Sequence, residues 1–186
     1  MKYLIASDIH GSALYCEKLL ERYQAEQADR LLLLGDLLYH GPRNDLPEGY
    51  APKTVISLLN ACRSEILCVR GNCEAEVDQM VLEFPVLADY ALLSLGNTLI
   101  FATHGHHWNA AQLPPLKPGD ILLHGHTHIP ACEPCGAAGE YMLLNPGSVA
   151  LPKDGSPHSY MTLEGSLFTW KRLDGEPYRT WQPETT

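Results

Sequence analysis

Three short apolar runs in the first half of the chain, each followed by polar residues or glycine, predict buried β-strands. They cover residues 2–6, 31–34 and 66–69. Apolar positions also recur at helical spacing after Ser12, over residues 53–62 and over residues 74–83. Serine is a favoured helix-capping residue, so the first helix is expected to begin at Ser12. The first half of the chain is therefore predicted to alternate strands and helices.

The second half of the chain is richer in strand patterns. Residues 90–95 and 98–103 flank Gly96-Asn97, which is a hairpin signal. Further strand-like runs lie at residues 120–123, 141–144, 160–163 and 167–173. This order predicts an α/β (α+β) sandwich, in which two mixed sheets pack together and helices lie outside. Residues 1–175 are expected to form a single domain, and the polar residues 176–186 a loose C-terminal tail.

Composition limits the classes of partner. The chain has 186 residues with 45% hydrophobic and 19% charged residues, which is typical of a globular domain. Its formal net charge is −9, which disfavours long nucleic acids and anionic membrane surfaces as partners. No apolar run approaches the roughly 18 residues of a membrane helix, and the apolar stretch at the N-terminus is too short for a signal peptide. A cytoplasmic location is therefore expected.

Nine histidines are many for this chain, and their positions suggest chemistry. Five predicted strands are followed directly by potential metal ligands. These are Asp8, His10, Asp36, Asn72, His104, His126 and His128. The carboxyl ends of strands form the ligand crevice in α/β sheets, so these side chains are expected to converge. Oxygen and imidazole donors without thiolates favour Mn, Fe or Zn.

Simpler explanations remain open for single residues. One aspartate or histidine at a strand end is usually a turn or capping residue, whereas five such motifs together are hard to explain in that way. His124 is expected to be packed or hydrogen-bonded, and His40 and His158 to lie in loops or on the surface. Cys132 and Cys135 form a CxxC pair, which leaves a metal-binding or redox module as a third reading.

The motifs DIHG, LLGD, GNCE, THGH and GHTH, in this order between residues 8 and 148, resemble those of calcineurin-like metallophosphoesterases. Within that superfamily, the long HGPRNDLPEGYAP loop and the NPGS segment are most similar to the bacterial YfcE-type phosphodiesterases. The resemblance implies a four-layer αββα sandwich. It also implies hydrolysis of small phosphodiesters by in-line attack of a metal-bridging hydroxide.

Transferred position by position, the resemblance implies two divalent metal ions that share Asp36. Asp8, His10, Asp36 and His128 would hold one ion, and Asp36, Asn72, His104 and His126 the other. Mn²⁺ is the expected metal, with Zn²⁺, Fe²⁺, Co²⁺ or Ni²⁺ as alternatives. The expected partner is a small phosphoester rather than a long nucleic acid or a membrane, and the relatives suggest a homo-oligomer. A phosphomonoesterase and a non-catalytic scaffold on the same fold are the alternative functions.

One motif departs from the family pattern, because Cys73 replaces the histidine of the usual GNHE. A thiol is a weak hydrogen-bond donor and a poor acid near neutral pH, so a preference for esters with good leaving groups is expected. His106 is the first candidate to protonate the leaving group instead, and His107 is the second. Arg43 could hold a substrate phosphate or be a solvated loop residue, and Lys153 has the same two readings.

Overall fold

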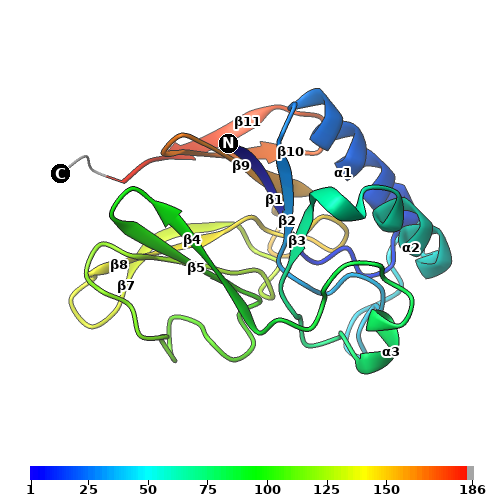
Figure 1. The fold of residues 1–186 in the computed structure, drawn as a ribbon, viewed down its shortest axis with the longest axis horizontal. Helices are drawn as coiled ribbons and strands as arrows, with labels where there is room; N and C mark the ends of the chain where they lie inside the picture. Colours follow the sequence, from blue (N-terminus) through cyan, green and yellow to red (C-terminus); the bar gives the residue numbers. More distant parts are fainter. Residues whose placement is uncertain (184–186) are drawn as a thin grey trace.

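Two β-sheets packed face to face form the centre of the molecule in the computed structural model, which describes residues 1–183 (Figure 1). The six-stranded sheet runs in the order β11 (Pro177–Trp181), β10 (Leu167–Arg172), β9 (Ser159–Glu164), β1 (Lys2–Ala6), β2 (Arg30–Leu33) and β3 (Ile66–Cys68). The five-stranded sheet runs in the order β4 (Tyr90–Leu95), β5 (Thr98–Thr103), β6 (Ile121–Leu123), β8 (Tyr141–Asn145) and β7 (Ala131–Cys135). The predicted sandwich of two mixed sheets is thereby confirmed.

The continuous apolar runs of β1 and β2 supply two separate cores. Successive strand residues point to opposite faces of a sheet. Leu4 and Leu31 therefore join the cluster under the helices, whereas Ile5 and Leu32 join the cluster between the two sheets. All four side chains are fully buried, which is why these strands show no alternation of apolar and polar residues.

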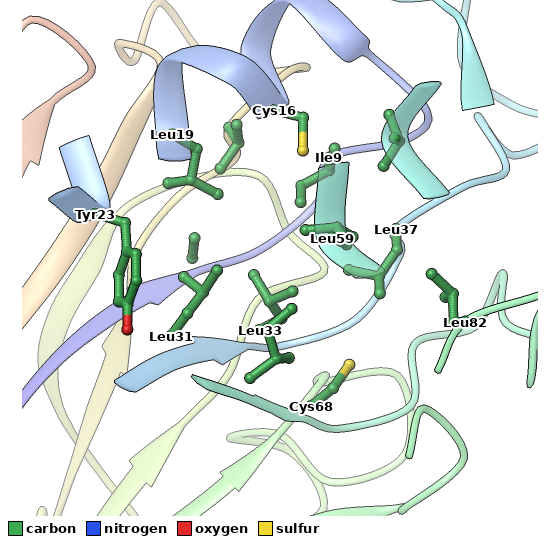
Figure 2. Packing of buried hydrophobic residues seen from close by; sticks show 14 of the residues in the cluster. Ile9, Cys16, Leu19, Tyr23, Leu31, Leu33, Leu37, Leu59, Cys68 and Leu82 are labelled. Atoms are coloured by element: carbon green, nitrogen blue, oxygen red, sulfur yellow. The ribbon is translucent and has the colours of Figure 1, made fainter. Parts of the chain in front are cut away.

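Helices α1 (Ala13–Ala25) and α2 (Pro52–Ala61) cover the outer face of the six-stranded sheet. Figure 2 shows Leu19 of α1 and Leu59 of α2 around Leu31 and Leu33 of β2. The Ser12 hydroxyl caps α1 by accepting a hydrogen bond from the backbone N–H of Tyr15 (3.2 Å). Both helices lie where the sequence predicted them.

The other side of the sandwich differs from the expected four layers. Within residues 1–183, no helix covers the outer face of the five-stranded sheet. Trp108, Leu113 and Leu116, from the irregular segment between β5 and β6, pack instead against Phe101 and Leu122. Loop side chains bury these strands, so no helical pattern is needed at this place in the sequence.

The third predicted helix is much shorter than expected, because α3 covers only Glu76–Gln79. Glu74, at the predicted start, is buried and its carboxylate accepts backbone N–H groups of neighbouring loops. Gln79 is the last residue of α3, and its side chain bonds the backbone of Leu82, Phe84 and Val86, which holds the following segment in a turn. The 3₁₀-helix η1 (Arg63–Glu65) precedes β3.

Two strands were missed from the sequence. β7 contains Pro134 and lies at the edge of its sheet, where a residue without an N–H is tolerated. β11 pairs antiparallel with β10, so the predicted loose tail is wrong for Pro177–Trp181. Residues 184–186 of that tail lie outside the described residues. Within residues 1–183, no helix is long and apolar enough to cross a membrane.

Candidate metal centre

The predicted ligands follow strands whose carboxyl ends lie side by side. β1, β2 and β3 are parallel neighbours in one sheet, and β5 and β6 are parallel neighbours in the other. The backbone N–H of His10 donates to the Asp36 carbonyl (2.9 Å), which joins the segments after β1 and β2. Between the two sheets, the backbone N–H of His126 donates to Asp8 Oδ2 (3.1 Å). The strand ends of both sheets therefore meet at a single site.

Four of the seven side chains form a first cluster. Asp8 Oδ1 lies 3.3 Å from His128 Nε2 and 3.5 Å from His10 Nε2. The two Nε2 atoms of His10 and His128 are 3.3 Å apart. Asp36 Oδ2 completes the cluster at 3.6 Å from His10 Nε2. These four residues are the predicted ligands of one ion.

The other three side chains form a second cluster around His104 Nε2, which lies beside the second oxygen of Asp36. Asp36 Oδ1 lies 3.5 Å from His104 Nε2. The same nitrogen is 3.1 Å from Asn72 Oδ1 and 3.2 Å from His126 Nδ1. Asp36 therefore presents one oxygen to each cluster.

The hydrogen bonds of the histidines suit metal binding. Three rings donate Nδ1–H to backbone carbonyls, so each presents the lone pair of Nε2 to the clusters. The pairs are His10 with Tyr39 (2.8 Å), His104 with Leu34 (2.6 Å) and His128 with Leu151 (2.6 Å). Asp8 Oδ1 is buried and accepts no hydrogen bond from the described residues. A cation would satisfy this oxygen and separate the facing nitrogens, so the donor set fits a metal ion.

The two carboxylates attract positive charge strongly. Burial favours the neutral form of Asp8, but the nearby His10 and His128 side chains hold its pKa well below the ordinary value. Burial likewise opposes protonation of His104, yet the hydrogen bond with Asp36 and the charge of Asp8 raise its pKa to about 9. His104 therefore retains its proton at neutral pH unless another cation replaces it.

The backbone at these positions is unusual. Five of the seven predicted ligands adopt left-handed φ angles, a conformation that side chains with a Cβ seldom take. They are Asp8 (61°), His10 (48°), Asp36 (57°), His126 (66°) and His128 (63°). Only Gln27 and Asp154 share this feature among the other non-glycine residues described. Such strain clusters at functional sites, where it directs side chains that the regular strand would point elsewhere.

Glu74 supports the site, although sequence analysis gave it no role. Its Oε2 accepts the backbone N–H groups of Asp36 (2.8 Å) and Gly71 (2.6 Å), and its Oε1 accepts that of Leu37 (2.7 Å). Burial and the charge of Asp36 raise its pKa to about 7, against the three amides, which favour the ionised form. Glu74 thereby fixes the loops after β2 and β3. The only sign of this role in the sequence is that Glu74 belongs to the GNCE motif.

The NPGS segment holds the remaining loops. The Ser148 hydroxyl donates to the carbonyl of Asp8 (2.9 Å). The Asn145 amide donates to the carbonyl of Gly125 (2.8 Å) and to the hydroxyl of Thr127 (3.0 Å). Both residues are fully buried, so this segment positions the loops that carry Asp8, His126 and His128. Sequence analysis used the motif only as a mark of resemblance.

A cavity of about 450 Å³ lies over the two clusters. Its lining includes Asp36, Asn72, His126 and His128 together with Arg43, Lys153 and Cys73. The structure thus places both Arg43 and Lys153 beside the site, where a solvated loop position was the other reading. Neither Arg43 nor Lys153 forms an ion pair within the described part of the chain.

Cys73 lies against the first cluster, with donor atoms of Cys73, His10 and Asp36 all within 4.8 Å of one another. Burial raises the pKa of its thiol, and the nearby charges of Asp36 and Glu74 raise it further. The group is therefore a neutral thiol near pH 7. A thiol with a raised pKa is a poor proton donor near neutral pH.

His106 lies beside the second cluster, with its ring centroid 5.4 Å from that of His104 and 6.2 Å from that of His126. Burial lowers the pKa of His106 to about 4, and the neighbouring histidines contribute. A neutral ring can donate a hydrogen bond, but it is a weak supply of protons at pH 7. Its role as proton donor stays a prediction.

The CxxC reading is not supported by the geometry. Cys132 packs with the cluster between the sheets, whereas Cys135 belongs to the cluster on the outer face of the five-stranded sheet. Side chains on opposite faces of a strand cannot converge on one ion. His124 is buried and hydrogen-bonded to the Gly125 carbonyl (2.9 Å), as predicted.

Comparison with known proteins gives consistent matches over most of the chain. The family model of the calcineurin-like phosphoesterase superfamily domain matches residues 1–166. Phosphodiesterase YfcE from Escherichia coli strain K12 is 46% identical over 169 residues, which cover 91% of this chain and 90% of the relative.

Solved structures extend the comparison to the fold. The structure of YfcE, a phosphoesterase from E. coli, covers 99% of this chain and 100% of its own, with 43% identity and a TM-score of 0.93. Vps29 from Entamoeba histolytica, complexed with Zn²⁺, is 24% identical with a TM-score of 0.59 over 98% of this chain and 99% of its own. The second likeness concerns the fold alone.

Proposed function

The chain belongs to the calcineurin-like phosphoesterase superfamily and is a phosphoric ester hydrolase, and on this premise we propose that it is a two-metal phosphodiesterase of small phosphoesters. The observation that carries the proposal is the division of Asp36 between the two clusters, with Oδ2 near His10 and Oδ1 near His104. A single-ion site would not need ligands on both oxygens. The proposed reaction is in-line attack of hydroxide on phosphorus.

In this proposal, the first ion is held by Asp8, His10, Asp36 and His128, and the second by Asp36, Asn72, His104 and His126. Two divalent ions would activate water as the nucleophile and neutralise the negative charge that develops on the phosphate oxygens. Mn²⁺ suits the mixed carboxylate, imidazole and amide donors, and Zn²⁺, Fe²⁺, Co²⁺ or Ni²⁺ are the alternatives.

The cavity residues would bind and orient the ester. The guanidinium of Arg43 can hold phosphate oxygens with two parallel hydrogen bonds, and the ammonium of Lys153 adds a second positive charge. Lys153 is held close to the centre because its backbone N–H donates to the carbonyl of His128 (3.2 Å). The neutral Cys73 thiol gives little help to a departing alkoxide, which favours esters with acidic leaving groups.

Arg43 and Lys153 also favour a second candidate, a phosphomonoesterase. A monoester carries about two negative charges at neutral pH, and two unpaired cations beside the clusters could bind the additional charge. The diester remains the leading proposal because the 46% identical relative is a phosphodiesterase. A cytoplasmic location and a homo-oligomer stay predictions from the sequence.

The test is a hydrolysis screen of bis(p-nitrophenyl) phosphate and p-nitrophenyl phosphate with Mn²⁺, Mg²⁺, Zn²⁺ or Co²⁺ added to metal-stripped protein. The diester is expected to react faster. Asp36→Asn should lower the rate more than about 100-fold, since even groups that only orient ligands cost 10–100-fold. Asp45→Asn, in an exposed loop position, is the matched control and should keep full activity.

Two outcomes would contradict the proposal. A faster reaction with the monoester would favour the phosphomonoesterase. No hydrolysis of either ester with any of the metals would favour a scaffold protein on this fold.

A further inference from the structure

A second, smaller cavity of about 270 Å³ lies beside the metal centre. It shares Asn72 with the cavity that holds Arg43 and Lys153, and they have no other lining residue in common. Asn72 is a proposed ligand of the second ion. A phosphate bound at the centre would therefore have two separate spaces within reach, one for each of two substituents.

No residue that lines this smaller cavity has an aliphatic or aromatic hydrocarbon side chain. The lining consists of Arg70, Gly71, Asn72, Asp89, His106 and His107. An aliphatic or aromatic hydrocarbon group would find no apolar side chain to pack against here. Its burial would also remove water from the charged groups without replacing their hydrogen bonds, which is unfavourable.

Arg70 and Asp89 are held in place through their main chains, and their side chains stay free. The Arg70 N–H donates to the carbonyl of Ala88 (2.7 Å), and the Thr103 hydroxyl donates to the carbonyl of Asp89 (3.1 Å). Although their charges are opposite and they line one cavity, the two side chains form no ion pair with each other. Within residues 1–183, neither side chain takes part in any hydrogen bond or salt bridge.

The remaining wall is formed by two imidazoles. The rings of His106 and His107 lie with their centroids 4.0 Å apart. Together with Arg70 and Asp89, they offer both hydrogen-bond donors and acceptors within one small space. Hydroxyl groups match such a wall, because each can accept from Arg70 and donate to Asp89.

We infer that this cavity binds one ester arm of the substrate, and that this arm carries hydroxyl groups, as in a glycerol or sugar phosphodiester. The inference rests on the proposed function, because it places the phosphate at the metal centre. Arg70 and Asp89 are then specificity residues that bind the arm, whereas the metal ligands bind the phosphate.

The test compares two phosphates that differ only in hydroxyl groups. Isothermal titration of the Mn²⁺-loaded protein with glycerol 1-phosphate and with propyl phosphate measures the two dissociation constants. Glycerol 1-phosphate is expected to bind at least about fivefold more tightly, which is the effect of one net hydrogen bond. In Arg70→Met and Asp89→Asn, this ratio should fall towards one, while propyl phosphate binding changes little.

Arg43→Met, in the neighbouring cavity, is the matched control. It should weaken the binding of both phosphates by the same factor. Equal affinities in the unchanged protein, or a ratio that persists in both variants, would overturn the inference. Absence of binding by either phosphate would instead count against the proposed metal centre, and the subsite would fall with it. Thermal unfolding of each variant shows whether its fold is retained.

Discussion

His10 and His128 face each other with their Nε2 atoms 3.3 Å apart, while each ring donates its Nδ1–H to a backbone carbonyl. Two neutral rings held in this way direct lone pair against lone pair. The contact becomes favourable only when a positive charge lies near both nitrogens, either a proton or a metal ion. Asp8 Oδ1, buried and without a partner in the described part of the chain, lies close to both rings.

Metal binding should therefore stabilise the folded protein. With free Mn²⁺ at 100 times its dissociation constant, the free energy of unfolding should rise by about 2.7 kcal/mol. The melting temperature would rise by several degrees and fall again on addition of a chelator. Differential scanning calorimetry measures both changes.

The matched variants for this prediction are His128→Asn and His158→Asn. The first removes a proposed ligand of one of the two ions and should reduce the shift caused by Mn²⁺. His158 stacks on Tyr15 and bonds the Val149 carbonyl, so its replacement should keep the shift even if it alters the starting stability. A full shift in His128→Asn would show that this ring binds no ion.

Glu74→Gln should weaken metal binding about 10- to 100-fold without removing any ligand. The glutamine amide would direct an NH₂ group at backbone N–H groups that now donate to the carboxylate, so the loops carrying Asp36 and Gly71 would shift. Titration with Mn²⁺ measures the affinity. Glu76→Gln, at an exposed position in α3, is the control. Unchanged affinity in Glu74→Gln would limit this residue to a role in folding.

Cys73→His should accelerate the hydrolysis of alkyl esters more than that of aryl esters. An alkoxide leaving group needs a proton, which imidazole supplies far better near neutral pH than a thiol with a raised pKa. We expect a gain of at least about tenfold with diethyl phosphate and a much smaller gain with bis(p-nitrophenyl) phosphate. Phosphorus NMR and absorbance follow the two reactions. Cys73→Ala should change neither rate strongly, and equal gains on both esters in Cys73→His would refute the explanation.

Glu26 connects α1 to the six-stranded sheet and provides a pH-dependent contribution to stability. Its carboxylate accepts hydrogen bonds from Lys171 (2.6 Å), Tyr160 (2.9 Å) and Lys2 (3.0 Å). Burial opposes ionisation, but these bonds lower its pKa below the ordinary value. The carboxylate therefore stabilises the fold above its unfolded pKa of about 4.3, and this contribution is lost as the pH falls through the lower folded pKa.

Glu26→Gln should accordingly cost about 2 kcal/mol at pH 7, and the difference should narrow below about pH 4.3. Urea unfolding at several pH values measures it. Glu164, whose side chain is 70% exposed and lies 3.4 Å from Lys2, is the matched control. Glu164→Gln should change stability by no more than about 0.5 kcal/mol. A difference that is constant with pH would contradict the assignment.

Apolar runs predicted the buried strands well, because β1 and β2 owe their position to burial on both faces. Exposed or irregular elements were harder to predict. β11 has four exposed residues of five, so it lacks the alternation that marks a half-buried strand. α3 begins only after Glu74, whose carboxylate accepts backbone N–H groups of Asp36 and Leu37, far away in sequence. It ends at Gln79, whose side chain bonds the backbone of the segment that follows.

The ligand set could be predicted because strand ends carry it. The sequence could not tell which atom of each side chain faces the site. His126 presents Nδ1, whereas His104 presents Nε2, and this choice depends on the distant Leu34 carbonyl that fixes the His104 ring. The small cavity lined by Arg70 and Asp89 could not be predicted from the sequence either, because neither residue belongs to a recognisable motif.

The left-handed backbone at five proposed ligands has an evolutionary consequence. Each such residue costs about 1 kcal/mol relative to glycine, so together they take a substantial part of the 5–15 kcal/mol by which a typical domain is stable. Glycine at Asp8 or His126 would relieve that cost while removing a ligand. A descendant released from hydrolysis would therefore gain stability by losing these side chains.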